Sequence, residues 1–314
     1  MSAHSVPLVP FSGRMSYCLI RSLKMVLEYR GQTYPTPWLE CVSGEPFGFV
    51  YVRQPDDLFA INGYAYHLAG EHLLRTLNYE YTYTGASNAE EALAALDTAL
   101  LDGPVVAGML DMGYLTYAPD HEAARGADHA IVVLTRDGES VTVHDPAGYP
   151  CVPLPLNDFL EAWQRDIYTG KPYGLWRIGM QGEPPDAETI WNTTLARARE
   201  NFAKANEEIG NGVSLLYGPG AMRTLAGDLR AEPERSLGAL PYFNWRVSAQ
   251  RCMDSAVFVR ERLPEAAAIR WEETRVYGEI QRSTVEERRA DLPTLIEELA
   301  VYETAFIAAL AEHW

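Results

Sequence analysis

The sequence has few cysteines and few basic residues for its length, and both shortages limit what the protein can be. Its 314 residues include four cysteines, Cys18, Cys41, Cys151 and Cys252, and none of them forms a C-x-x-C pair. This scatter indicates neither a disulfide framework nor a structural zinc site. Lys and Arg number 26 against 43 Asp and Glu, which gives a formal net charge of −17. Nucleic acids and anionic membrane surfaces attract basic patches, so we expect neither as a partner.

Long apolar runs are also absent. No stretch of 18 apolar residues occurs, which argues against a transmembrane helix. The first residues, MSAHSVPLVPFSG, lack the basic region and the long apolar region of a signal peptide. With 47% hydrophobic and 22% charged residues, the composition is that of an ordinary soluble globular protein. We therefore expect a cytoplasmic protein.

Helix and strand patterns alternate in the first half of the chain, and helical patterns dominate the second half. The segment QGEPPDAE at residues 181–188 contains two prolines and a glycine, which suits a linker between domains. We expect two domains, an α+β domain with an antiparallel sheet at residues 1–183 and an all-helical domain at residues 184–314. The segment GNGVSLLYGPG at 210–220 is interpreted as a connection between two helices.

A cysteine stands where the first helix is expected to begin. Apolar residues in the segment SYCLIRSLKMVLEYRG recur at the helical spacing i, i+4, i+7 and i+8: Leu19, Leu23, Val26 and Leu27. Ser16 is a candidate N-cap and Gly31 a candidate C-terminal stop. Cys18 then falls in the first turn, where the partial positive charge of the helix stabilises a thiolate. The alternative is that Cys18 is a small buried apolar residue, as many free cysteines are.

A nucleophilic cysteine needs an imidazole within hydrogen-bonding reach and often a third group that orients the ring. His129 begins the apolar strand pattern HAIVVLT, which follows a polar loop. An Asp-Gly turn at 137–138 joins it to SVTVHDP, which ends at Asp145. In such a hairpin the carboxylate of Asp145 can accept the ring N–H of His129 and fix its tautomer. Each residue alone has an ordinary structural explanation, but the ordered set favours a catalytic site.

The remaining histidines do not indicate a metal site. His67 and His72 share one predicted helix with Glu71, but they are five residues apart. This spacing turns the two rings away from each other, unlike the H-E-x-x-H pattern of zinc enzymes. We expect no metal and no cofactor.

The order of these features resembles the papain-like cysteine peptidase superfamily, in particular its C39-type branch. There a cysteine opens the first helix, and a histidine-led strand, a turn and a strand ending in Asp-Pro follow. The closer resemblance is to the family of the butirosin biosynthesis protein H N-terminal domain. Five segments between residues 13 and 165 carry it in order: SYCLIRSLKMVLEYRG, SGEPFGFVY, PVVAGMLDMGYLTY, DHAIVVLTRDGESVTVHDP and PLPLNDFLEAW. The helical second half more loosely resembles the region that accompanies this domain.

The resemblance implies a papain-like fold for residues 1–183, with Cys18 as nucleophile, His129 as base and Asp145 as the residue that orients the base. The named family member moves an acyl group from a carrier-protein thioester to an aminoglycoside amine. The resemblance therefore implies a cysteine-dependent acyl or aminoacyl transferase, or an amide hydrolase, that acts on a small molecule. An acyl carrier protein or another thioester donor is the implied partner.

One departure from the superfamily affects the expected reaction. Papain-like peptidases place a glutamine shortly before the cysteine to stabilise the oxyanion, whereas this sequence has Ser12 there and no Asn or Gln in residues 1–31. Loss of such a donor typically slows catalysis by about 10²–10³-fold. The departure favours acyl transfer from an activated thioester over proteolysis. Two alternatives stay open, a non-catalytic small-molecule-binding protein that retains the fold and a cysteine peptidase that acts on small peptides.

Residues near the expected cleft are candidates for substrate binding. The segment DMGYLTY at 111–117 supplies polar and aromatic groups for a substrate amine, and the segment SGEPFGF at 43–49 supplies a wall for an acyl pocket. Ordinary packing explains both segments as well. The candidates are Tyr17, Ser43, Phe47, Asp111, Tyr114 and Tyr117.

Overall fold

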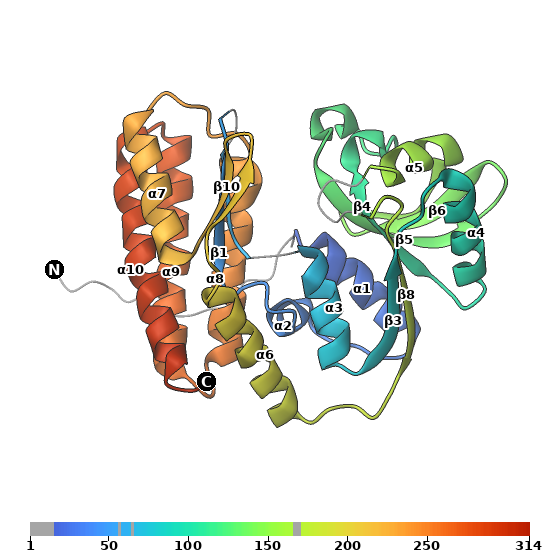
Figure 1. Cartoon of the computed structure of the whole chain (residues 1–314), viewed down its shortest axis with the longest axis horizontal. Helices are drawn as coiled ribbons and strands as arrows, with labels where there is room; N and C mark the ends of the chain where they lie inside the picture. Colours follow the sequence, from blue (N-terminus) through green and yellow to red (C-terminus); the bar gives the residue numbers. More distant parts are fainter. Residues whose placement is uncertain (1–15, 56–57, 64–65, 166–170) are drawn as a thin grey trace. The chain divides into compact units, whose positions relative to one another are not determined.

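The computed structural model describes residues 16–55, 58–63, 66–165 and 171–314 (Figure 1). The chain divides into two compact units, and each is interleaved in sequence with the other. The sheet unit comprises residues 17–39 and 66–186, and the helical unit comprises residues 40–65 and 187–314. None of the described helices is both long enough and apolar enough to span a bilayer.

The sheet unit is built on an antiparallel sheet in the order β3-β8-β4-β5-β6-β7. Its strands are β3 (Tyr79–Thr84), β4 (Val105–Asp111), β5 (Asp128–Arg136), β6 (Ser140–Asp145), β7 (Tyr149–Pro155) and β8 (Leu175–Gln181). Its helices are α1 (Cys18–Tyr29), α3 (Tyr66–Thr76), α4 (Ala89–Leu100) and α5 (Leu156–Trp163), with short 3₁₀ turns η1 (Met112–Tyr114) and η2 (His121–Ala124). Helix α2 (Thr36–Val42) spans the point where the chain passes into the helical unit.

Alternating side chains along the strands bury both faces of this sheet. Leu175 of β8 belongs to a cluster with α4 and α5 residues, whereas its neighbour Trp176 lies against Gly70 of α3, close to Leu19 of α1. Helix α1 packs on β5 and β4 through the apolar face that the sequence predicted. The Ser22 hydroxyl adds a hydrogen bond to the carbonyl of Ala130, at 3.0 Å, which ties α1 to the first part of β5.

The helical unit contains one small sheet beside its helices. The sheet has the order β2-β1-β10-β9, all antiparallel, from β1 (Phe49–Arg53), β2 (Leu58–Asn62), β9 (Glu207–Gly210) and β10 (Val213–Tyr217). The helices are α6 (Ala187–Phe202), α7 (Gly218–Ala231), α8 (Trp245–Val259), α9 (Pro264–Val285) and α10 (Leu292–Ala311), with a π-helical turn η3 (Leu240–Asn244) and a 3₁₀ turn η4 (Arg289–Asp291). Helix α10 packs against both α7 and α9, and these three run side by side (Figure 1).

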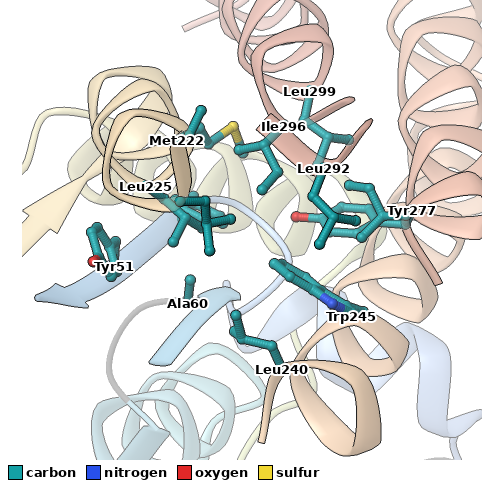
Figure 2. Packing of buried hydrophobic residues seen from close by; sticks show 14 of the residues in the cluster. Tyr51, Ala60, Met222, Leu225, Leu240, Trp245, Tyr277, Leu292, Ile296 and Leu299 are labelled. Atoms are coloured by element: carbon teal, nitrogen blue, oxygen red, sulfur yellow. The ribbon is translucent and has the colours of Figure 1, made fainter. Parts of the chain in front are cut away.

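Strands from the first half of the chain complete the core of the helical unit. Tyr51 of β1 and Ala60 of β2 are buried in a cluster with Leu225, Trp245 and Ile296 from α7, α8 and α10 (Figure 2). Burial of apolar surface contributes roughly 25 cal/mol per Å². Residues 40–65 therefore fold with the C-terminal helices, although the sequence analysis placed them in the first domain.

Two buried arginines also hold residues 40–65 in the helical unit. The guanidinium of Arg251 on α8 contacts Glu40 at 2.8 Å and Glu45 at 2.9 Å, and it donates to the carbonyl of Asn62. Burial raises the pKa of Glu40 to about 7, although the charge of Arg251 favours the carboxylate. Arg270 on α9 donates to the carbonyl of Pro46 at 3.1 Å and pairs with two buried carboxylates, Glu273 and Glu303.

The structure confirms the predicted fold class of mixed helix and sheet, with antiparallel sheets and a helical C-terminal region. The predicted hairpin around Asp137 is also confirmed, because β5 and β6 pair antiparallel. The segment 210–220 differs from its interpretation as a helix–helix connection, since Val213–Tyr217 is strand β10. The C-terminal half is therefore not purely helical, and β10 pairs with β1, a partner distant in sequence.

Arg251 provides a test of the buried ion pairs. We expect Arg251→Met to lower the free energy of unfolding by about 3–5 kcal/mol near pH 8, because Glu40 and Glu45 are left buried without a counter-charge. The loss should be smaller near pH 5, where the Glu40 carboxyl, whose pKa burial raises to about 7, takes up a proton. Urea denaturation measures both values. The matched control is Arg246→Met, an exposed position on the same helix, and an equal loss in the two variants would contradict the assignment.

Candidate active site

Cys18 is the first residue of α1 and is partly exposed. The sequence suggested Ser16 as the N-cap, but the N-cap residue is Tyr17, and no side chain caps the helix. The first backbone N–H groups of a helix have no acceptor within the helix, and they give its N-terminus a partial positive charge. The described structure therefore puts the thiol where a thiolate is stabilised.

The structure brings His129 and Asp145 to this thiol. His129 is the second residue of β5, and Asp145 is the last residue of β6. The Nε2 atom of His129 lies 2.7 Å from Oδ1 of Asp145, and both side chains are buried. The Cys18 thiol also lies within electrostatic reach of the His129 ring. Because Asp145 engages Nε2, the Nδ1 atom is the ring nitrogen left for Cys18.

The environment of the His129 ring favours its protonated form. Burial disfavours the charged ring, but the charge of Cys18 and the hydrogen bonds to Asp145 and Cys18 outweigh it and raise the pKa of His129 to about 10. Asp145 is also buried, which by itself would raise the pKa of its carboxyl. The hydrogen bonds from His129, the Ala147 N–H and the Tyr117 hydroxyl hold that pKa below its ordinary value instead. These contacts thus favour a protonated His129 ring backed by an ionised carboxylate at Asp145.

A cavity of about 400 Å³ adjoins the site on the Asp145 side. It runs along α1, because Arg21 and Met25 lie three and seven residues after Cys18 on the same helical face. Sequence reasoning missed these residues, although that spacing was there to be read. The lining residues are Arg21, Lys24, Met25, Glu28, Thr36, His144, Asp145, Pro146, Gly148 and Pro150.

The other substrate-binding candidates of the sheet unit take part mainly in local structure. Tyr17 is buried. Asp111 accepts hydrogen bonds from the N–H groups of Gly113 and Gly126, at 2.8 and 2.9 Å, and so shapes its own loop.

Tyr114 lies between two arginines. The guanidinium carbons of Arg125 and Arg165 lie 4.6 and 4.7 Å from the centre of its ring. Arg165 also donates to the Tyr114 hydroxyl at 2.5 Å. Tyr117 differs from the other candidates, because its hydroxyl donates to Oδ2 of Asp145 at 2.8 Å.

Ser43 and Phe47 belong to the helical unit, and both side chains are buried there. The Ser43 hydroxyl donates to the carbonyl of Glu40 at 2.6 Å. The ring of Phe47 stacks on Phe306, with 6.3 Å between the ring centres. Phe47 is therefore a core residue and not the wall of an open pocket.

Three further positions named from the sequence are Ser12, His67 and His72. Ser12 lies outside the described residues, as does the side chain of His67. His72 lies 3.4 Å from the Thr76 hydroxyl on its own helix. Among the side chains that the structure describes, no group of three or more His, Cys, Asp or Glu is placed to hold a metal ion.

Comparison with protein families covers both halves of the chain. Residues 17–146, which include Cys18, His129 and Asp145, match the family described as "Butirosin biosynthesis protein H, N-terminal". Residues 213–311 match the family described as "YobF C-terminal domain". The first match confirms the resemblance stated from the sequence, and the second concerns helices α7–α10 with strand β10.

Two individual proteins are similar to this chain. The protein YobF of Bacillus subtilis (strain 168) is 27% identical over 286 residues, which cover 85% of this chain and 87% of YobF. A crystal structure described as a C39-like peptidase from Bacillus anthracis is 18% identical, with a TM-score of 0.35, and covers 57% of this chain and 96% of its own.

Alkylation tests the reactivity of the thiol. We expect iodoacetamide to label Cys18 about tenfold faster than Cys151 at about pH 6.5, because a thiol without such partners is almost entirely protonated there. Cys151 is exposed, so access does not favour Cys18. Cys41 and Cys252 should react last, since burial raises both of their pKa values well above the ordinary range. Peptide mass spectrometry measures each rate. Equal labelling of Cys18 and Cys151 would support a packing role for Cys18.

The His129 ring offers an independent test by NMR titration. Its raised pKa means that the folded protein holds the ring proton more tightly than the unfolded chain does. The resulting stabilisation is complete below pH 6.5 and is lost as the pH rises through about 10. In Cys18→Ala the burial of the ring is no longer opposed by the charge of Cys18, so we expect the ring pKa to fall. An unchanged pKa of His129 in this variant would show that the charge of Cys18 does not act on the ring.

Proposed function

We propose that the protein is a cysteine-dependent acyl or aminoacyl transferase that acts on a small molecule through an acyl-Cys18 intermediate. The observation that carries the proposal is the contact of His129 with both Cys18 and Asp145. The match of residues 17–146 to the butirosin biosynthesis protein H family supports it further. The coarser assignment, to a papain-like cysteine enzyme, rests on the same residues.

The first half-reaction follows from the ion pair. The Cys18 thiolate attacks the carbonyl carbon of a thioester, and a tetrahedral oxyanion forms. The N–H groups in the first turn of α1 are the candidate donors to that oxyanion. The intermediate then collapses, the carbon–sulfur bond of the donor breaks, and the leaving thiolate takes the proton of the His129 imidazolium. Acyl-Cys18, a free thiol and a neutral ring remain.

The second half-reaction restores the starting state. A substrate amine attacks acyl-Cys18 while neutral His129 accepts the proton that the nitrogen loses. The bond between the acyl carbon and Cys18 breaks, which releases the amide and regenerates the thiolate beside the imidazolium. Asp145 keeps its charge throughout and stabilises the ring when it is protonated. Water in place of the amine would give the amide-hydrolase or thioesterase variant of the same chemistry.

A thioester suits this site better than a peptide does. An amide is a poor electrophile with a poor leaving group, so its cleavage depends strongly on oxyanion stabilisation. A thioester is already activated, and it releases a thiolate that needs less help from the general acid. The cavity beside Asp145 offers about 400 Å³ of room for part of a small substrate.

Intact-mass spectrometry tests the proposal. We expect incubation with a panel of N-acetylcysteamine thioesters to add one acyl mass, and a primary amine acceptor to discharge it. Cys18→Ala should abolish the adduct, whereas the matched variant Cys151→Ala should retain it. Asp145→Asn should slow adduct formation by about 100-fold, the usual scale of acid–base assistance, with an unchanged circular dichroism spectrum.

Other outcomes decide between the alternatives. Cleavage of small peptides that depends on Cys18 would make the protein a peptidase. Tight binding of an unmodified small molecule, with no adduct from any thioester, would favour a binding protein that retains the fold. An adduct that persists in Cys18→Ala would overturn the assignment of the nucleophile.

A further inference from the structure

The carboxylate of Asp145 is held at both oxygens. Oδ1 lies 2.7 Å from Nε2 of His129 and accepts the N–H of Ala147 at 2.6 Å. Oδ2 accepts the hydroxyl of Tyr117 at 2.8 Å. The His129 bond and the Ala147 bond share Oδ1. The Tyr117 hydroxyl holds the other oxygen, Oδ2, and so limits rotation of the carboxylate about its Cβ–Cγ bond.

Tyr117 reaches Asp145 from a loop that the structure fixes independently. Leu115, two residues earlier, is buried in the core of the sheet unit and donates its N–H to the carbonyl of Met112 at 3.1 Å. The half-buried ring of Tyr117 packs at 5.3 Å from the ring of Tyr149, at the start of β7. Burial raises the pKa of Tyr117 well above its ordinary value, and the Asp145 carboxylate raises it further. The hydroxyl is therefore a permanent donor.

We propose that Tyr117 is a positioning residue of the Cys18–His129–Asp145 site and not a substrate-binding residue. Its hydroxyl keeps the Asp145 carboxylate ionised and turned toward His129, and through that ring it supports the thiolate of Cys18. The inference rests on the proposed function, because a positioning role presupposes a reactive Cys18, but its test needs no substrate. Tyr117 acts through Asp145, so it is not itself a catalytic residue.

Removal of the hydroxyl alone has a defined consequence. In Tyr117→Phe the ring stays against Tyr149, and Oδ2 of Asp145 loses its only hydrogen bond among the described residues. A buried carboxylate with fewer donors has a higher pKa. Asp145 then takes up a proton at a less acidic pH, and the imidazolium loses its counter-charge there. The acid limb of the Cys18 alkylation profile should accordingly lie at a higher pH than in the parent protein.

Other titratable groups around Asp145 do not replace this donor. Nearest are His129 and Cys18 on the ring side and Tyr149 beside Tyr117. The cavity along α1 is lined on the same side by Arg21, Lys24, Glu28 and His144. Lys24 pairs with Glu28 on its own helix, and Nδ1 of His144 accepts the N–H of Cys151 at 2.9 Å. The structure records no hydrogen bond from these cavity side chains to the carboxylate of Asp145.

The pH profile of Cys18 alkylation by iodoacetamide tests the inference. In Tyr117→Phe we expect the acid limb of the profile to move up by about one pH unit, the scale of a hydrogen bond to a charged group. Asp145→Asn should move it at least as far. The matched control is Tyr149→Phe, which removes the neighbouring hydroxyl and should leave the limb in place.

The outcomes separate this inference from the proposed function. An acid limb in Tyr117→Phe that coincides with the parent limb would overturn the positioning role, even if thioesters acylate Cys18. A slower rate at every pH with no shift of the limb would mean that Tyr117 only packs the loop, and it would also overturn the inference. A shifted limb together with no acyl adduct from any thioester would support Tyr117 and reject the acyl-transfer proposal alone.

Discussion

The seating of α1 against β5 is the constraint on which the candidate site depends. Its apolar face is buried, and the Ser22 hydroxyl holds the carbonyl of Ala130. Ala130 directly follows His129, so the same contact that packs the helix also sets the distance between the ring and the first turn, where Cys18 stands. The packing of α1 and the geometry of the candidate site therefore depend on the same contacts. A core substitution in α1 would disturb the placement of Cys18 relative to His129 without changing either residue.

The helical unit includes a segment from early in the chain, residues 40–65, and specific contacts hold that segment in place. Residues 40–65 contribute strands β1 and β2, and these need a partner strand and a buried face. Strand β10 supplies the first, and α7–α10 supply the second (Figure 2). Arg251 adds directional contacts to Glu40, Glu45 and the carbonyl of Asn62. Buried ion pairs add little net stability, but the loss of one partner leaves the other charge buried and uncompensated.

Local signals in the sequence were sufficient for the three central residues and insufficient for their surroundings. Cys18 was found from a helix start, and His129 with Asp145 from a hairpin, because both patterns lie within a few residues. Strand β10 was missed because only the short, exposed strand β9 pairs with it nearby, and its other partner is residues 50–53 of β1, far away in sequence. Phe47 and Tyr117 were given roles from their neighbours in sequence, whereas their contacts come from Phe306 and Asp145. Spacing along the chain carries no information about such distant partners.

The segment that matches the butirosin biosynthesis protein H family contains only part of the sheet that holds His129. It ends at residue 146, and the sheet that holds His129 continues through β7 and β8. Strand β8 lies between β3 and β4, where Trp176 pairs with Val106. Without β8, strand β3 would lose its partner and β4, the neighbour of β5, would become an edge strand. The same segment contains β1 and β2, whose buried residues Tyr51 and Ala60 pack in one cluster with residues of α7–α10. The three candidate catalytic residues and the contact between α1 and β5 lie within the match, whereas strands β7 and β8, which complete their sheet, lie beyond it.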